Sequence, residues 1–299
     1  MIARTKFKSE SEKLKYVCEC DADFEQRLDK MMKQICDVDG IRFITLSGPT
    51  CSGKTTASKK LITEFSERGR NVKIISLDDF FRDAADLEAE CTDGVLDFDS
   101  EKALDLEELS AFMHGLQTKG FARLPKFDFV KARRTHFEEF SMGDADTVVF
   151  EGIQAIYPEF TSLFESGTRH LSIYISVLTD LILNGKVISP RQIRLWRRLV
   201  RDYRFRGADP EFSFRLWEGV VRNEDKNILP FADKSDFKID SLHGYEPCIL
   251  ACELKKLMKM IPQNSRYYEK SLQITQTLSD VDTINEKYLP ENSLYHEFV

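Results

Sequence analysis

The stretch GPTCSGKTT, residues Gly48–Thr56, decides the fold because it fits the phosphate-binding loop pattern G-x-x-x-x-G-K-[ST] in full. A short β-branched, apolar run precedes it at residues 41–47, and residues 57–68 carry apolar side chains at helical spacing. Strand, loop and helix therefore follow in the order that the motif requires. Backbone N–H groups of such a loop and the positive end of the helix dipole face one spot, which predicts a phosphate site.

Each position of this loop has an expected role toward a nucleotide. Lys54 is expected to reach the β and γ phosphates, and the hydroxyl group of Thr55 is expected to bind Mg²⁺. Cys51 lies inside the loop, where it is either a small filler or an oxidisable thiol. The residues expected to bind the nucleotide cofactor, ATP, are Gly48, Thr50, Ser52, Gly53, Lys54, Thr55 and Thr56, with Arg197 and Arg206 from a later segment.

Composition and charge narrow the class of protein. The chain has 299 residues, of which 42% are hydrophobic and 31% charged, and this balance is typical of a globular protein. A net charge of −7 does not favour a nucleic-acid surface. No apolar run approaches the roughly 18 residues of a membrane span, and the first residues lack an apolar signal core. The seven cysteines lack metal-binding spacing and are expected to be free thiols. We therefore expect a cytoplasmic protein without a membrane partner.

Further apolar runs predict a sheet around the loop. Together with residues 41–47, four segments read as strands separated by helical patterns: 71–77, 147–150, 171–177 and 236–240. This order predicts an α/β fold of the P-loop NTPase type, with three layers, α/β/α, and a five-stranded parallel sheet. The connecting segments are expected to be a surface connection over 84–99, a small β hairpin over 120–140 and an irregular connection over 180–190.

Acidic residues follow two of these strands. Asp78 comes directly after residues 71–77, and Glu151 comes directly after 147–150. Ligands of doubly wound sheets bind at the carboxyl ends of the strands, so both side chains are candidates for chemistry. Asp78 is the preferred candidate for a general base, whereas Asp79 is either an alternative base or a cap of the next turn. Glu151 is expected to reach a nucleotide-bound magnesium ion.

An arginine-rich helix completes the set of charged groups. Residues 191–206 carry seven arginines with few acids between them, and four share one helix face: Arg194, Arg197, Arg198 and Arg201. Because these cations would repel one another on a solvated face, the pattern favours an anionic ligand. Phosphoryl transfer from ATP needs a phosphate cradle, a metal, positive charge and an acceptor base. The residues expected to carry this catalysis are Lys54, Asp78, Arg198 and Arg201.

These features resemble the uridine kinase and phosphoribulokinase family of P-loop kinases, and more closely its uridine kinase branch, from about Ile41 to Ile261. The similar segments are Ser76–Phe81, Phe98-Asp99, Lys126–Val130, Phe150–Ile153 and Arg194–Asp202 with Arg206-Gly207. The resemblance implies that Asp78 is the base, that Glu151 lies on the magnesium side and that Arg194–Gly207 forms a lid. The expected acceptor contacts are Asp79, Phe81, Phe98, Asp99, Phe127, Phe129 and Arg134.

The expected activity is ATP-dependent phosphorylation of a hydroxyl group, most closely the 5′-hydroxyl of a pyrimidine nucleoside. Uridine kinases usually carry Tyr, Tyr and His where this chain has Phe81, Phe127 and Ala132, which leaves another small alcohol or a sugar phosphate open as acceptor. A non-catalytic ATP-binding regulator is a further alternative function. Association with further copies of the chain, as a homo-oligomer, is also left open. The expected units are a helical extension (1–40), a P-loop kinase domain (41–262, lid about 190–207) and a C-terminal helix and tail (263–299).

Overall fold

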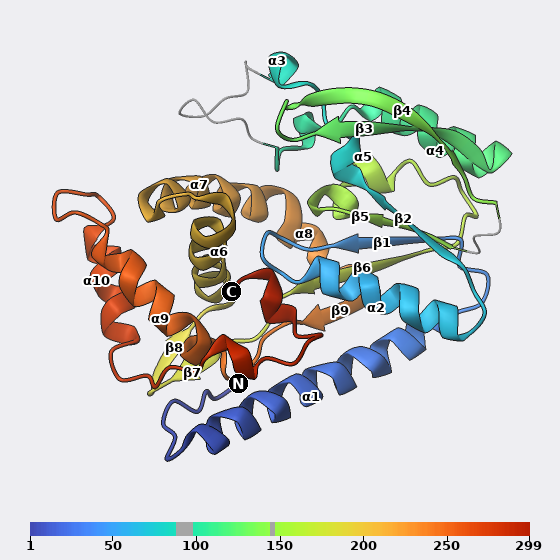
Figure 1. The fold of residues 1–299 in the computed structure, drawn as a ribbon. Helices are drawn as coiled ribbons and strands as arrows, with labels where there is room; N and C mark the ends of the chain where they lie inside the picture. Colours follow the sequence, from blue (N-terminus) through green and yellow to red (C-terminus); the bar gives the residue numbers. More distant parts are fainter. Residues whose placement is uncertain (88–97, 144–146) are drawn as a thin grey trace.

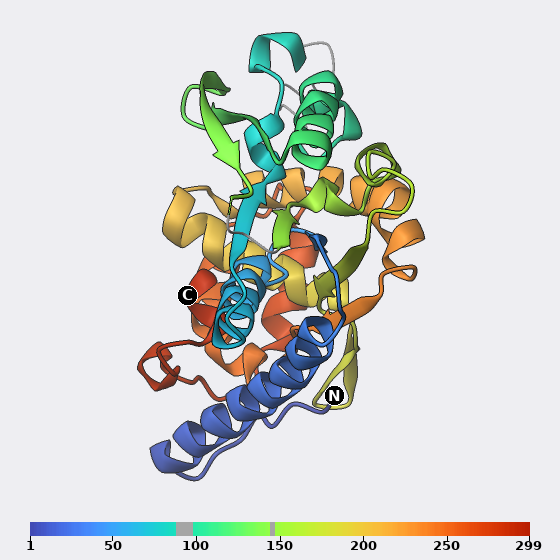
Figure 2. The same cartoon turned by 90° about the vertical axis from the view of Figure 1, so that its right-hand side faces the viewer.

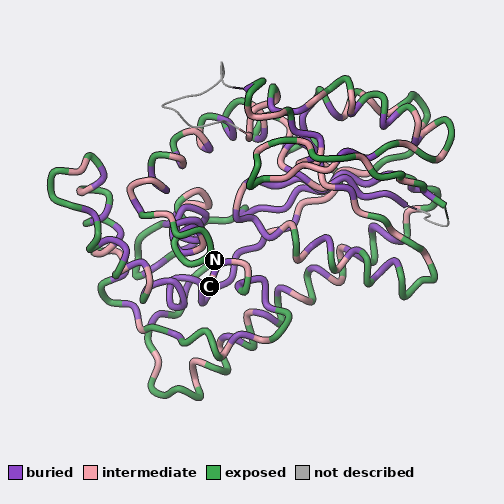
Figure 3. Tube along the Cα trace, turned by 45° about the horizontal axis from the view of Figure 1, so that its top comes forward, coloured by how far each residue is buried: buried purple, intermediate pink, exposed green. Residues whose placement is uncertain are grey.

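A five-stranded sheet forms the centre of the structure, a computed structural model that describes residues 1–87, 98–143 and 147–299. The strand order is β2-β5-β1-β6-β9, and every neighbouring pair is parallel. The strands are β1 (Phe43–Ser47), β2 (Val72–Ser76), β5 (Thr147–Glu151), β6 (His170–Ser176) and β9 (Phe237–Asp240). The predicted strands and parallel sheet are confirmed. The central strands β1 and β5 are largely buried, as expected for a parallel sheet covered by helices, whereas the edge strands β2 and β9 are partly exposed (Figure 3).

Helices cover the two faces of this sheet and make three layers (Figures 1 and 2). On one face, α1 (Glu10–Cys36) and α2 (Lys54–Glu67) pack on the sheet through one apolar cluster that includes Ile35, Leu61 and Phe65. On the other face lie α4 (Leu106–Lys119) and α5 (Pro158–Thr161), whose cluster includes Phe112 and Phe160. The short α3 (Ala84–Leu87) lies beside the turn of the hairpin described below and adds Leu87 to this cluster. The helical periodicity of the first 40 residues therefore serves core packing.

A group of helices lies beyond the carboxyl edge of the sheet (Figure 1). It contains α6 (Pro190–Arg206), α7 (Pro210–Asn223), α8 (Leu229–Ala232), α9 (Glu246–Lys259) and α10 (Tyr268–Thr277). The final segment packs into the same group through buried side chains such as Leu294 and Phe298. Within the described ranges, no helix combines the length and apolar character that a membrane crossing requires.

Two β hairpins lie outside the five-stranded sheet. The first, β3 (Phe121–Asp128) with β4 (Arg133–Ser141), is the hairpin expected over residues 120–140. The second, β7 (Leu181–Leu183) with β8 (Lys186–Ile188), occupies the segment expected to be irregular, so that prediction is wrong. Its turn is Asn184-Gly185, and both residues have positive φ (49° and 78°), the geometry that favours a two-residue hairpin. Of the surface connection expected over 84–99, residues 88–97 lie outside the described residues.

The strand order brings three loops together at one edge. Strand β5 lies between β1 and β2, and Glu151 is in register with Leu46 of β1 and with Ser76 of β2. The segments that follow these three strands therefore leave the sheet side by side. The segment after β1 is the phosphate-binding loop, the segment after β2 carries Asp78, and Glu151 is the last residue of β5.

Candidate active site

The phosphate-binding loop connects β1 to α2 and depends on two glycines. A Cβ atom on Gly48 would lie 2.2 Å from the carbonyl oxygen of Ile175, and Gly53 has φ +97° at the N-cap of α2. Lys54 Nζ donates to the carbonyl oxygens of Gly48 (2.9 Å) and Pro49 (3.4 Å). Ser52 is 1% exposed, and its Oγ has no hydrogen-bond partner among the described residues. Such a buried hydroxyl fits a loop that binds a polar ligand.

A cavity of about 410 Å³ opens over this loop. Loop residues that line it are Thr50, Cys51, Ser52, Gly53, Lys54 and Thr55; Gly48 and Thr56 lie in the same loop and the first turn of α2. Four acidic side chains line the cavity, Asp78, Asp99, Glu151 and Glu297, together with four basic ones, Lys54, Arg198, Arg201 and Arg206. The structure thus brings together the expected base, the metal-side acid and three expected arginines.

Asp78 lies in the short 3₁₀ turn η1 (Leu77–Phe80) that directly follows β2. Its backbone N–H donates to Ser76 Oγ (3.3 Å), which fixes the start of the turn. Burial, followed by the negative charge of Glu151, raises the pKa of Asp78 to about 7, although the charge of Lys54 opposes the rise. A carboxyl group that titrates near neutral pH is well suited to exchange a proton with a bound hydroxyl group.

The oxygen groups of Thr55 and Glu151 line the same cavity. Magnesium at nucleotide sites takes one or two carboxylates and hydroxyl groups and completes its shell with phosphate and water oxygens. The hydroxyl and carboxylate present here fit that donor set. They are the residues that would hold the divalent metal.

Three arginines of α6 face the cavity and share a single acid. Asp202, which is buried, pairs with Arg198 (3.0 Å), Arg201 (3.0 Å) and Arg206 (3.3 Å). Arg201 also donates to Thr50 Oγ1 in the loop (3.3 Å). Three cations with one shared carboxylate leave net positive charge toward the cavity.

Two other arginines of α6 lie inside the protein and do not line the cavity. Arg194 pairs with Glu224 (2.5 Å), and Arg197, which is 0% exposed, pairs with Glu246 (2.5 Å). The expectation that four arginines offer one face to an anion is wrong for these two, because acids distant in the sequence neutralise them. Arg197 instead donates to the carbonyl oxygen of Cys51 (3.1 Å), so it supports the loop from behind.

Phenylalanine rings form part of the cavity lining. Phe81 packs against Phe98, Phe127 and Phe129, with ring centroids 5.1, 5.7 and 6.2 Å away. Phe81, Phe98 and Phe129 line the cavity together with Asp99. Phe127 packs behind the cavity lining, in contact with the rings of Phe81 and Phe98.

Asp79 points to the hairpin and does not line this cavity. Its carboxylate accepts from Lys126 Nζ (2.9 Å) and from the backbone N–H of Phe127 (3.4 Å). These contacts hold β3 against η1. Neither alternative left open for Asp79, base or cap, describes this contact, which fixes the position of the hairpin. Asp79 was also expected to contact the acceptor, and the structure places it on the hairpin instead.

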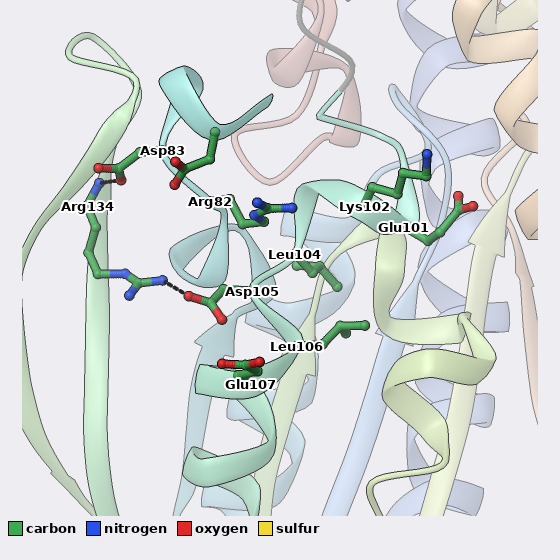
Figure 4. Close-up of a pocket in the computed structure, with 10 residues that line it drawn as sticks. Arg82, Asp83, Glu101, Lys102, Leu104, Asp105, Leu106, Glu107 and Arg134 are labelled. Atoms are coloured by element: carbon green, nitrogen blue, oxygen red, sulfur yellow. Dashed lines mark hydrogen bonds and ion pairs between the residues drawn. The ribbon is translucent and has the colours of Figure 1, made fainter. Parts of the chain in front are cut away.

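Arg134, expected to contact the acceptor, lies in a different pocket of about 720 Å³ (Figure 4). Its guanidinium group pairs with Asp105 (2.7 Å), and its backbone N–H donates to Asp83 (2.7 Å). Arg82, Lys102 and several acids complete the lining. The structure therefore separates Arg134 from the cavity that contains Asp78.

Two cavity residues were missed by the sequence reasoning. Gln154 donates to the carbonyl oxygen of Phe98 (2.7 Å). It directly follows Phe150–Ile153, the segment that resembles the kinase family, so extending that match by one residue would have included it. Glu297 accepts hydrogen bonds from Thr56 at the start of α2. No pattern in residues 263–299 indicates that contact.

Comparisons with known proteins find several kinases that are similar to this chain. Uridine-cytidine kinase B of Dictyostelium discoideum is 30% identical over 190 residues, which cover 64% of this chain and 67% of that protein. A uridine kinase of Deinococcus deserti is 27% identical over 179 residues, which cover 60% of this chain and 77% of that protein. The structure of a possible uridine kinase from Bacillus stearothermophilus has a TM-score of 0.49 at 17% identity, and the match covers 73% of this chain and 100% of that one.

The model of the phosphoribulokinase/uridine kinase family matches residues 43–245, which is more than half of the chain. This range contains the loop, Asp78, Glu151 and α6. Kinases of this class use a nucleotide and a divalent metal. The chain is an ATP-dependent kinase and belongs to the phosphoribulokinase/uridine kinase family.

Proposed function

We propose that this kinase transfers the γ-phosphoryl group of ATP to the 5′-hydroxyl group of a pyrimidine nucleoside, with Mg²⁺ as its metal. One observation carries the proposal: the phosphate-binding loop, Asp78, Glu151 and the lid arginines line a single cavity of about 410 Å³. These are the groups that phosphoryl transfer requires, because catalysis of this reaction consists mostly of positioning and charge stabilisation.

At the donor end, the chain binds and orients the triphosphate. The loop N–H groups and Lys54 hold the phosphates, and Lys54 exchanges its bonds to the loop carbonyls for bonds to phosphate oxygens. Thr55 and Glu151 would hold the metal, and ATP with Mg²⁺ would supply the phosphoryl group and part of the charge compensation. Arg198 and Arg201 stabilise the negative charge of the group in transfer.

At the acceptor end, Asp78 orients the hydroxyl group and accepts its proton. Asp78 lines the cavity between the loop and the phenylalanine rings, where an acceptor would lie next to the terminal phosphate. Its raised pKa makes it a stronger base than an exposed aspartate. Asp99 lines the same end and is available to accept hydrogen bonds from the acceptor's other hydroxyl groups.

The replacement Asp78→Asn tests this role. We expect kcat to fall by about 10²- to 10⁴-fold, since the amide cannot accept the proton, while ATP affinity changes little. ADP release with uridine and cytidine, at saturating ATP and magnesium, measures the rate. Asp79→Asn is the matched control, because Asp79 contacts the hairpin, and it should cost far less. A wild-type rate for Asp78→Asn would contradict the assigned base.

A second candidate acceptor is a non-nucleoside alcohol with an apolar or aromatic body. Phenyl rings line the acceptor end, and Phe81, Phe127 and Ala132 offer no polar side-chain group that reads a base edge. The same ADP assay with a panel of nucleosides and small alcohols separates the two candidates. A higher kcat/KM for an apolar alcohol than for uridine and cytidine would replace the nucleoside proposal.

A further inference from the structure

We propose that Glu297 is a built-in competitor of the nucleotide: its carboxylate occupies an anion position at the start of α2, and a phosphate group must displace it. The inference rests on the proposed function of the loop as a nucleotide site. It adds that the affinity for ATP is set partly by the chain's own C-terminal segment, Ser293–Val299.

The contact itself is that of an anion at a helix N-terminus. Thr56 is the third residue of α2, so its backbone N–H is one of the donors that lack a partner within the helix. Glu297 Oε1 accepts from this N–H (3.0 Å) and from the Thr56 hydroxyl group (2.7 Å). A phosphate oxygen binds helix N-termini through the same kind of donors. The carboxylate therefore stands where a phosphate group of the nucleotide would bind.

The segment also reaches the loop at a second point. Leu294 lies so close to Gly53 that a Cβ atom on this glycine would come within 2.2 Å of Leu294 Cδ1. Glu297 lines the same cavity as Lys54 and Asp78. In Figure 1 the segment, dark red, runs beside the end of the sheet where α2 begins. The contact with Thr56 thus belongs to the cavity proposed to bind the triphosphate.

The segment is anchored on both sides of Glu297. Tyr295 is fully buried, donates its hydroxyl group to Glu246 and accepts from Arg197 Nη2 (3.2 Å). Phe298 is buried as well, whereas Glu297 is only half-buried. Rotation of one side chain therefore frees Thr56, while the backbone of the segment keeps its place. The Glu297 carboxylate thus lowers the affinity for the nucleotide but does not block the cavity permanently.

Charge adds to the competition for Thr56. Glu297 is one of four acids that line the cavity, and a triphosphate brings several further negative charges. Glu297→Gln removes a repulsive charge, and Glu297→Ala also frees the two donors of Thr56. If the carboxylate instead supported the nucleotide site by holding Thr56 in place, replacing Glu297 would weaken nucleotide binding. Whether the Kd falls or rises therefore distinguishes a competing carboxylate from a supporting one.

Calorimetric titration of the full chain tests the proposal, with ATP and inorganic tripolyphosphate as separate probes in the absence of magnesium. We expect Glu297→Gln and Glu297→Ala to lower the Kd for both probes by about three- to thirty-fold, the range that corresponds to losing a competing helix cap. Glu291→Gln is the matched control, because Glu291 is exposed just before this segment and the charge change is identical. An unchanged or higher Kd in both Glu297 variants would overturn the proposal.

The two probes separate this inference from the proposed function. Tighter tripolyphosphate binding by the Glu297 variants supports the competitor even if no alcohol accepts a phosphoryl group, in which case only the proposed function fails. If the wild-type chain phosphorylates an acceptor but the Glu297 variants bind both probes as the wild type does, the kinase assignment stands and the competitor is refuted.

Discussion

The two sets of arginines on α6 have the same residue type and the same helical spacing but opposite surroundings. Arg194 and Arg197 are buried, and each has a buried glutamate within 2.5 Å. Arg198, Arg201 and Arg206 line the cavity and share one carboxylate, that of Asp202. The number of acids per arginine, rather than the number of arginines, therefore decides where positive charge is available to a phosphate.

The difference also separates an arginine that supports the phosphate-binding loop from one that faces the bound ligand. Arg197 reaches the carbonyl oxygen of Cys51 from inside the protein, whereas Arg201 reaches the Thr50 hydroxyl group from the cavity. Both arginines contact the same loop, but only the second is in a position to touch a ligand. Replacing members of the two sets should accordingly affect different measurements: the free energy of unfolding for the first set and the rate for the second.

The largest effect is expected for Arg197→Met. Removing one partner of a buried ion pair leaves Glu246 charged and uncompensated, which costs about 3–5 kcal/mol of the free energy of unfolding. This is a large part of the roughly 5–15 kcal/mol that stabilises a typical domain. Denaturant unfolding of the purified variant, compared with the wild type, measures the loss.

Arg204→Met is the control for this prediction. Arg204 lies on the same helix, and its pair with Glu286 (2.6 Å) is exposed, so the loss should stay within about 1 kcal/mol. Adding Glu246→Gln to Arg197→Met should recover part of the stability, since it removes the stranded charge. Equal losses for the Arg197 and Arg204 variants would mean that burial does not distinguish these arginines.

The next effect in size is expected for Arg201→Ala. A positive group that stabilises charge mainly in the transition state contributes about 10²- to 10³-fold to kcat, and its loss should leave the Kd for ATP within about tenfold. Turnover with the best acceptor and calorimetric titration with ATP measure the two quantities. Arg198→Ala should show the same pattern, whereas Arg204→Ala should leave both unchanged. Parallel losses in kcat and affinity would instead identify ground-state binding.

The features that the sequence predicts correctly have local patterns. The loop matches an eight-residue motif, most strands are largely apolar runs, and Asp78 and Glu151 stand at the carboxyl ends of strands that the parallel order brings to one edge. The hairpin at residues 181–188 was also within reach, because Asn184-Gly185 between two short apolar runs is a known hairpin signal.

The features that the sequence does not predict depend on distant partners. Arg194 meets Glu224 and Arg197 meets Glu246, 30 and 49 residues away, so helical spacing alone places all the arginines on one face without separating buried from available ones. The contact between Thr56 and Glu297 spans 241 residues. Such pairs depend on how α7, α9 and the final segment pack, and local patterns do not encode that packing.

The smallest effect is expected for Arg206→Ala, and its salt dependence sharpens the comparison within the cavity set. The Arg206 side chain is 59% exposed, whereas that of Arg201 is 16% exposed. At about 0.01 M ionic strength, where the Debye length is about 30 Å, we expect Arg206→Ala to weaken ATP binding by about two- to fivefold. At about 0.15 M, where it is about 8 Å, this effect should vanish, while the kcat loss of Arg201→Ala should persist because that guanidinium group is shielded from solvent. Titrations and rates at both ionic strengths check this, and a loss for Arg206→Ala that survives at the higher one would show direct contact with the nucleotide.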